Sequence, residues 1–448
     1  MPALSKYCYL ILICFNFKRR IMLRQHMFSR LICSIRNNPY DFIYVLFYAG
    51  ILATLAMVLV NPDEALKVFI VCAILSLPLI GKNIKHVLSH KQNLFLPFML
   101  LLFGLVQIIW VEIFKQPGSA FTGAYRSYQN GGKVMIFAAL VIAALTSQPS
   151  RAIKNHIVSI WVIITAIGLY FYAGYQLAGA PDLSTYRVAL GFEHPTGAAY
   201  GLTFIALLAS QAILNLRLKH TVSLYLLHFL ISLAVIITTQ TRAAILIYPL
   251  LSIGLFFIHY RHNRTILLRA LLAFAVLVGL AAIPLKSVIE NRYQNMMVDL
   301  HSYSQSNSNT SIGARFAMQR VGIDAGKAHY LGQSLEQRDA EIKVSALQNV
   351  SLQGALAYVD IHLHNEVIDT FSLKGIPGVV VLILLYSAMF LIGYTQRSPL
   401  LFAISGAIAI YGLSDLLLYA KGEALSSVLT LCVAVMLVPG PTRERCHD

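Results

Sequence analysis

Long apolar runs alternate with short polar segments along most of this chain of 448 residues. A helix needs about 20 mainly apolar residues to cross the hydrocarbon core of a bilayer. On that criterion the pattern predicts an all-α polytopic membrane protein with about 12 transmembrane helices. The helices are expected near residues 42–60, 65–81, 94–114, 134–147, 157–179, 196–214, 222–239, 243–260, 266–285, 376–394, 399–418 and 424–439.

The composition agrees with this class of protein. Hydrophobic residues make up 57% of the chain and charged residues 12%, whereas soluble domains carry about 25% charged residues. The formal net charge is +16, but the basic residues lie in short patches between apolar runs. They form no basic domain with interleaved aromatic residues, so nucleic-acid binding is a poor interpretation. The six cysteines lack the spacing of a metal site or a disulfide framework.

Lysine and arginine mark the cytoplasmic side of a membrane protein. They concentrate in residues 1–40 and in alternate connections such as 82–91 and 261–269, where acidic residues are almost absent. We therefore expect both ends of the chain in the cytoplasm. Residues 1–40 are interpreted as a basic leader and residues 440–448 as a tail.

The same alternation divides the rest of the chain into three parts. Residues 41–289 are expected to form transmembrane helices 1–9, residues 290–375 an outer loop, and residues 376–439 helices 10–12. With about 85 residues the loop is far longer than ordinary connections, and loops of this length are usually functional. In a Gram-negative cell it would lie in the periplasm.

Within this loop, residues 301–311 are predicted to be an irregular linker. A short helix should follow, with Thr310 or Ser311 as its N-cap. Arg315 and Gln319 would share one side of that helix. Arg315 is either a functional charge or part of an ordinary solvated helix face.

A second arginine, Arg242 in TTQTRAAILIYPL, is expected in a tight turn on the outer side of the membrane. A charge at a helix end can serve as an anchor, but the positive-inside rule disfavours arginine on this side, and misplaced charge usually has a use. Arg126 and Arg187 are weaker candidates of the same kind.

The segment HLHNEVIDTFSLKGIPG, residues 362–378, is unusually polar for its position before an apolar run. Read as a helix, it would place Asp360 one turn from His364, and His362 one turn from Glu366. A neighbouring carboxylate holds the tautomer of a histidine and raises its basicity, as a general base requires.

Two other interpretations of this segment stay open. Two histidines with a nearby glutamate could bind a divalent metal, or the polar groups could simply satisfy one another in a packed loop. Further along, Gly375 and Gly378 flank the point where the chain must turn into the next span. Asp415 lies in a later apolar segment and needs a partner there, either in the site or as a structural hydrogen bond to a neighbouring helix.

Arginines and a histidine on an outer membrane face indicate a specific kind of chemistry. ATP is absent outside the cytoplasm, so bond formation there must use a substrate that was activated before it crossed. A lipid-linked pyrophosphate sugar is such a substrate. Its leaving group develops negative charge, which guanidinium groups can neutralise, and a histidine can take the proton of the attacking hydroxyl.

The segments TQTRAAILIYP, TSIGARFAMQRVGI and HLHNEVIDTFSLKGIPG, in this order, resemble the bacterial O-antigen ligases of the O-antigen ligase and polymerase superfamily. The resemblance extends over about residues 40 to 435 and includes GLSDLLLYAK near the end. One family pattern is an arginine followed four positions later by leucine, here Arg242 and Leu246. The other is His-Asn, nine residues, then Gly-x-x-Gly, here beginning at His364 and Asn365 and ending at Gly375 and Gly378.

The resemblance implies a metal-independent, inverting glycosyltransferase similar to the GT-C class, without a cofactor. It would transfer O-polysaccharide from undecaprenyl pyrophosphate to lipid A-core at the periplasmic face of the inner membrane, completing lipopolysaccharide. By the same resemblance, Arg242 and Arg315 would bind the donor pyrophosphate and His364 would activate the acceptor hydroxyl. The supporting residues would be His362, Asn365, Glu366, Gly375 and Gly378.

Three other functions are weighed against this one. An O-antigen polymerase would use the same donor, and a protein O-oligosaccharyltransferase would share the chemistry but transfer to serine. A flippase for lipid-linked sugars should place charges along a path through the membrane and often shows repeated halves. No such repeat is visible in this sequence.

Overall fold

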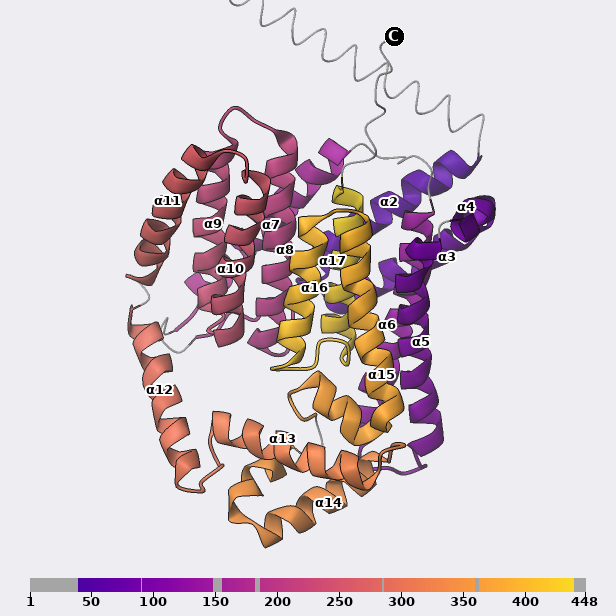
Figure 1. Cartoon of the computed structure of the whole chain (residues 1–448), viewed down its shortest axis with the longest axis vertical. Coiled ribbons are helices and arrows are strands. Elements are labelled where there is room, and N and C mark those ends of the chain that lie inside the picture. Colours follow the sequence, from indigo (N-terminus) through magenta and orange to yellow (C-terminus); the bar gives the residue numbers. More distant parts are fainter. Residues whose placement is uncertain are drawn as a thin grey trace, which may run out of the picture.

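The computed structural model describes residues 39–89, 91–147, 155–181, 186–283, 286–358 and 362–438. The leader before residue 39 and the tail from residue 439 lie outside them. The described part is helical throughout (Figure 1). Its elements are α2 (Pro39–Met57), α3 (Pro62–Lys82), α4 (Ile84–Ser89), α5 (Lys91–Phe114), α6 (Thr122–Thr146), α7 (Asn155–Ala178), α8 (Pro195–Leu216), α9 (Thr221–Thr238), α10 (Arg242–His259), α11 (Arg264–Ala282), α12 (Lys286–Ser304), α13 (Ser311–Ala328), α14 (Leu335–Gln348), the 3-10 helix η1 (Val350–Tyr358), α15 (Glu366–Thr395), α16 (Pro399–Gly412) and α17 (Lys421–Leu437).

Within the described residues, nine helices are long and apolar enough to cross a membrane, which makes the chain a multi-pass membrane protein. They are α2, α3, α5, α6, α7, α8, α9, α10 and α15. The predicted count of about 12 is therefore not confirmed. The other three predicted spans correspond to α11, α16 and α17, of which α16 has 14 residues and α17 has 17.

The centre of this bundle is formed by α8 and α17, which are buried on all sides. A helix that is apolar around its whole circumference belongs inside a large protein or a membrane domain. Outer helices such as α3 instead leave apolar residues exposed on one side, including Val71, Ile74 and Leu77. That exposed side is the face expected to meet lipid.

Several predicted boundaries were wrong. The fourth span was predicted at 134–147, but α6 begins at Thr122. Its polar first turns bury Tyr125 and Tyr128 against protein, so they do not need an apolar surface. The predicted span at 399–418 ends early, because α16 stops at Gly412. The predicted linker at 301–311 is partly helical, because α12 continues to Ser304.

The long loop forms a helical arm, which we define as α12, α13, α14 and η1. Figure 1 shows α12 descending beside the bundle and α13 and α14 lying beneath it. The predicted short helix is confirmed as α13, and Thr310 caps it by accepting a hydrogen bond of 3.1 Å from the N–H of Gly313. The arm has its own small core around Met318, Ile342 and Leu363.

The arm is attached to the bundle at a kink in α15. Gly375 has φ of +61°, in the left-handed region that favours glycine. A Cβ atom there would lie 2.1 Å from the carbonyl oxygen of Tyr330, and that oxygen accepts a hydrogen bond of 2.9 Å from the N–H of Ile376. The motif glycine therefore permits the contact that holds the arm against the membrane helices.

Candidate active site

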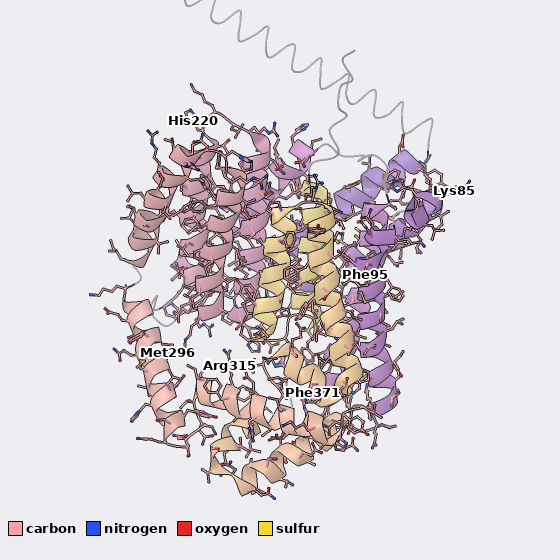
Figure 2. The ribbon with its side chains drawn as sticks, in the orientation of Figure 1. Lys85, Phe95, His220, Met296, Arg315 and Phe371 are labelled. Atoms are coloured by element: carbon pink, nitrogen blue, oxygen red, sulfur yellow. The ribbon has the colours of Figure 1, made fainter. Side chains whose placement is uncertain are left out.

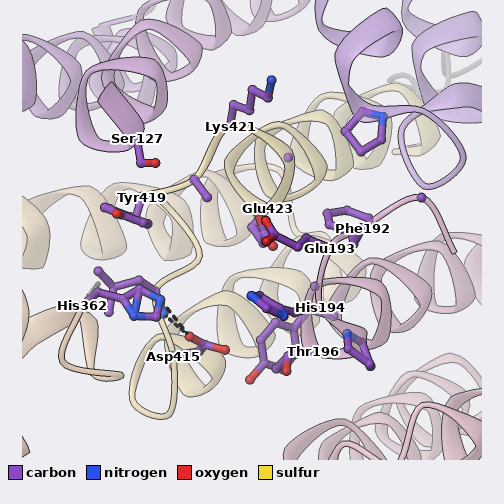
Figure 3. A pocket seen from close by; sticks show the side chains of 18 of the residues that line it. Ser127, Phe192, Glu193, His194, Thr196, His362, Asp415, Tyr419, Lys421 and Glu423 are labelled. Carbon is purple, nitrogen blue, oxygen red and sulfur yellow. Dashed lines mark hydrogen bonds and ion pairs between the residues drawn. The ribbon is translucent and has the colours of Figure 1, made fainter. Parts of the chain in front are cut away.

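A cavity of about 1120 Å³ opens where the arm meets the end of the bundle. Its walls come from the α2–α3 turn, the first turns of α6, the segment leading into α8, α13, residues near 362, and the α16–α17 connection. Figure 3 shows part of this lining. Its ionisable lining residues include Asp63, Arg126, Arg187, Glu193, His194, Arg315, His362, His364, Asp415, Lys421 and Glu423.

Two histidines converge on one carboxylate in this cavity. Oδ1 of Asp415 lies 3.2 Å from Nδ1 of His364 and 3.5 Å from Nε2 of His362 (Figure 3). The same oxygen accepts a hydrogen bond of 2.9 Å from the N–H of Leu416. In the tautomer that is protonated at Nδ1, the Nδ1–H of His364 donates a hydrogen bond to Asp415. Nε2 is then unprotonated and can accept a proton.

The predicted helical pairing of His362 with Glu366 was wrong. Residues 362–365 form no helix, and His364 has φ of +48°, so the chain turns sharply before α15 begins at Glu366. Asp360, the predicted partner of His364, lies outside the described residues. The partner of both histidines is Asp415, which is 51 residues beyond His364 in the chain.

Asn365 and Glu366 hold the segment that carries Asp415. The Asn365 side chain caps α15, accepting from the N–H groups of Val367 and Ile368, and donates a hydrogen bond of 3.0 Å to the carbonyl oxygen of Leu413. The Glu366 carboxylate accepts hydrogen bonds of 2.8 Å from the N–H of Leu418 and 2.6 Å from the Tyr386 hydroxyl. Both side chains therefore fix the α16–α17 connection against the start of α15.

The environment changes the acid–base properties of His362 and Asp415. Burial, together with the neighbouring His364, lowers the pKa of His362 to about 4. A neutral His362 with so low a pKa is a poor proton acceptor near neutral pH. Burial alone would raise the pKa of Asp415, but the hydrogen bond and charge of His364 outweigh it and the pKa is lowered. Asp415 is therefore an anion that can stabilise a protonated His364.

A buried ion pair holds the backbone between the two histidines. Asp369 accepts hydrogen bonds of 2.8 Å from Nη1 of Arg338 and 3.1 Å from the N–H of Leu363, the residue between the two histidines. Its second oxygen accepts from the Tyr128 hydroxyl. Arg338 and Asp369 are fully buried. The sequence did not single out either residue, because Arg338 lies among other charged residues in LEQRDAEIK and no local spacing relates it to Asp369, 31 positions later.

Three of the four candidate arginines line the cavity, namely Arg126, Arg187 and Arg315. Arg315 points from α13 toward the bundle in Figure 2. Arg187 donates a hydrogen bond of 3.0 Å to the carbonyl oxygen of Thr239. Arg126 and Arg187 were predicted to be weaker candidates than Arg242, yet they share the cavity with His364.

Arg242 occupies a different position. It is the first residue of α10 and is not among the described residues that line the cavity. Its neighbour Thr241 connects it to the site, because the Thr241 hydroxyl oxygen lies 3.5 Å from Nη2 of Arg187. Leu246, the other residue of this motif, is 66% exposed one turn further along α10, which is typical of a lipid-facing position.

The motif glycines Gly375 and Gly378 also lie away from the cavity lining and shape the kink of α15. In contrast, several lining residues were not predicted from the sequence, among them Glu193, His194 and Glu423. They lie in short segments that have no distinctive spacing, so only their common position at the cavity identifies them.

The cluster of His362, His364 and Asp415 also has the spacing of a metal site. One ligand atom from each residue lies within 4.8 Å of the other two, and imidazole with carboxylate suits Zn²⁺. The Asp415 oxygen is already engaged by His364 and Leu416. The arrangement can therefore act either as a base with its orienting carboxylate or as three ligands for a divalent ion.

Comparison with known proteins identifies the family. The profile of the family described as O-antigen ligase matches residues 227–383, a span that contains Arg242, Arg315 and His364. A curated protein named O-antigen ligase from Escherichia coli (strain K12) is 31% identical over 396 residues, which cover 87% of this chain and 92% of that relative. The chain therefore belongs to the O-antigen ligase family and is a membrane-bound transferase.

Proposed function

We propose that this ligase transfers O-polysaccharide from undecaprenyl pyrophosphate to a sugar of lipid A-core, and thereby completes lipopolysaccharide. The observation that carries the proposal is the pairing of His364 with Asp415 in one cavity with Arg126, Arg187 and Arg315. A base and several guanidinium groups in a common cavity are what the transfer of a sugar from a pyrophosphate requires.

In the proposed reaction, Nε2 of His364 accepts the proton of the acceptor hydroxyl. The hydroxyl oxygen attacks the anomeric carbon of the donor, and the bond from that carbon to the pyrophosphate oxygen breaks on the opposite face. The configuration of the anomeric centre is therefore inverted. Asp415 stabilises the positive charge that develops on His364, and His362 beside it limits the orientation of the imidazole ring.

The departing pyrophosphate carries away the electron pair of the broken bond, and its charge must be compensated. Arg315 is the proposed principal ligand because, of the three arginines on the cavity wall, it alone lies in the segment that the family profile matches. Guanidinium groups bind phosphate oxygens in pairs. Arg126 and Arg187 extend the same basic wall. Arg242 is a further proposed ligand, reaching the pyrophosphate from the turn that contacts Arg187. No metal ion is needed in this scheme.

The proposed location is the inner membrane of a Gram-negative cell. Both ends of the chain would be cytoplasmic, and the cavity and arm would face the periplasm. The basic connections between spans at the end of the bundle away from the arm support this orientation. The acceptor and the donor are both lipid-linked, so the cavity must be reached from the outer leaflet.

The test is the lipopolysaccharide of a strain that lacks the gene and carries either the wild-type or the His364→Ala protein. With the variant we expect core-only lipopolysaccharide on gels and long polymer retained on undecaprenyl pyrophosphate, at normal levels of inserted protein. Core capped by a single repeat would indicate a polymerase instead. Normal smooth lipopolysaccharide with the variant would remove His364 from the mechanism.

A further inference from the structure

The cavity has a second wall whose chemistry differs from that of the arginines. The segment before α8 and the first turn of α17 contribute Phe192, Glu193 and Glu423 to it (Figure 3). Two carboxylates and an aromatic ring do not suit a pyrophosphate, because like charges repel. The mechanism proposed above uses none of these three side chains.

Gly197 leaves the room that the Glu423 carboxyl group occupies. A Cβ atom added to Gly197, near the start of α8, would lie 2.5 Å from Oε1 of Glu423 and 2.7 Å from Cδ1 of Phe192. The missing side chain of Gly197 thus leaves the space in which the carboxylate and the ring lie side by side. The carboxyl group also lies beside the N-terminal end of α8, where the helix dipole favours an acidic side chain.

The Glu423 carboxylate makes no hydrogen bond or ion pair with another of the described residues. The nearby ammonium group of Lys421 does not neutralise it, because Lys421 is paired with Asp63 at 2.5 Å on the rim of the cavity. The donor to Glu423 among the described residues is its own backbone N–H, so the remaining acceptor positions of this recessed carboxyl group are unfavourable to leave empty unless a ligand or water fills them. Its lining position means that a ligand in the cavity can do so.

We propose that Glu423 and Phe192 form a binding subsite for an uncharged sugar ring, distinct from the basic wall that faces the pyrophosphate. Sugar hydroxyls are donors that match the two carboxylate oxygens. The apolar face of the ring can lie against the aromatic side chain, whose geometry suits flat contacts. Glu193 adds negative charge that disfavours phosphorylated groups at this wall.

This subsite rests on the proposed function in one respect, because the sugar that fills it belongs either to the polysaccharide donor or to the core acceptor. Both carry hydroxyl groups, and both must meet near His364. The chemistry of the wall is common to the two sources, so the experiment measures each of them separately.

The test is equilibrium binding to the purified full-length protein in detergent. The probes are the oligosaccharide released from lipid A-core and the polysaccharide released from the donor, each free of lipid. We expect Glu423→Gln to weaken the binding of one probe by about 10-fold to 100-fold, as for a lost hydrogen bond to a charged group. The affected probe identifies the source of the sugar.

Gly197→Ala is a second variant that keeps the carboxylate but pushes it and Phe192 out of place. It should weaken the binding of the same probe. Glu112→Gln makes the same chemical change on an exposed side chain outside the cavity, and it should leave binding unchanged. Affinity for both probes that is equal in wild type and Glu423→Gln, or no binding of either probe to the wild type, would overturn the subsite.

Transfer activity is measured with the same preparations to separate the two proposals. Wild-type protein that binds a probe in a Glu423-dependent way but transfers no polymer would contradict the proposed function and leave the subsite standing. If the wild-type protein transfers polymer and Glu423→Gln binds both probes with wild-type affinity, the subsite is contradicted and the proposed function stands. Both variants must be folded, as judged by a single symmetric peak in size-exclusion chromatography. If Glu423→Gln does not fold, the binding measured with Gly197→Ala tests the subsite.

Discussion

The backbone N–H of Leu363 donates a hydrogen bond of 3.1 Å to Oδ1 of Asp369, and this contact fixes the chain between His362 and His364. The same carboxylate pairs with the buried Arg338 of the arm. One side chain thus connects the arm, the membrane helices and the two histidines.

The first prediction follows from this ion pair. Asp369→Ala leaves the Arg338 guanidinium buried without its partner, which typically costs about 3–5 kcal/mol of stability. We expect a large fall in the thermal unfolding temperature of the purified protein. Asp324→Ala, which removes an exposed pair with Arg320 on α13, should change stability by less than about 1 kcal/mol. Equal effects of the two variants would show that the buried pair is not a major structural anchor.

Asp415→Asn should reduce turnover more than substrate binding. The amide keeps the shape of the side chain but removes the charge that stabilises protonated His364. Since general base catalysis contributes about 10²- to 10⁴-fold, we expect kcat to fall by roughly 10²-fold, with little change in KM. Combined with His364→Ala, the substitution should cause no further loss, because the two residues act as a unit. Multiplied losses in the double variant would assign Asp415 a separate role.

The low pKa of His362 predicts a specific acid sensitivity. The unfolded chain takes up a proton near pH 6.5, whereas folded His362 does so only near pH 4. Stability should therefore fall as the pH is lowered from about 6.5 to 4, by up to about 3 kcal/mol from this residue. Thermal unfolding across that range should depend less on pH in His362→Gln. His220→Gln, at an exposed position at the opposite end of the bundle (Figure 2), should follow the wild type.

Arg315 is proposed to bind the donor pyrophosphate, and its charge and shape can be tested separately. Arg315→Ala should lower transfer by roughly 10²- to 10³-fold, as for the loss of a group that neutralises developing charge. Arg315→Lys should retain more transfer activity than Arg315→Ala but less than the wild type, because an ammonium group cannot make the paired contacts of a guanidinium group. Arg320→Ala is the matched control on the exposed side of the same helix and should be active.

Arg242→Ala should also reduce transfer if Arg242 contacts the pyrophosphate in the bound state. Activity near that of wild type would make Arg242 an anchor of the α9–α10 turn. In that case the basic wall of the cavity would consist of Arg126, Arg187 and Arg315.

A chelator separates the two chemical interpretations of the histidine cluster. If His364 is a base oriented by Asp415, transfer by purified protein should continue unchanged after treatment with EDTA. Loss of activity that Zn²⁺ or another divalent ion restores would instead make His362, His364 and Asp415 metal ligands. The wild-type protein and both purified substrates are sufficient for this measurement.

The sequence alone determined the membrane class, most of the spans and the segments that contain the site. Partition into a membrane depends on the hydrophobicity of each segment by itself, so it can be read locally. The helix cap was narrowed to Thr310 or Ser311 for the same reason, because capping involves neighbours three residues apart, and the structure shows Thr310. The motif order identified the family before any contact was known.

The tertiary structure decided which side chains meet. Asp415 reaches His364 because α16 ends at Gly412 and the following turn folds back to the start of α15. No local pattern specifies a contact across 51 residues. The same packing brings Arg126, Arg187 and Glu423 to one cavity and leaves Arg242 outside its lining. Hydrophobicity selects the helices, but only their packing against one another determines the geometry of the polar groups at their ends.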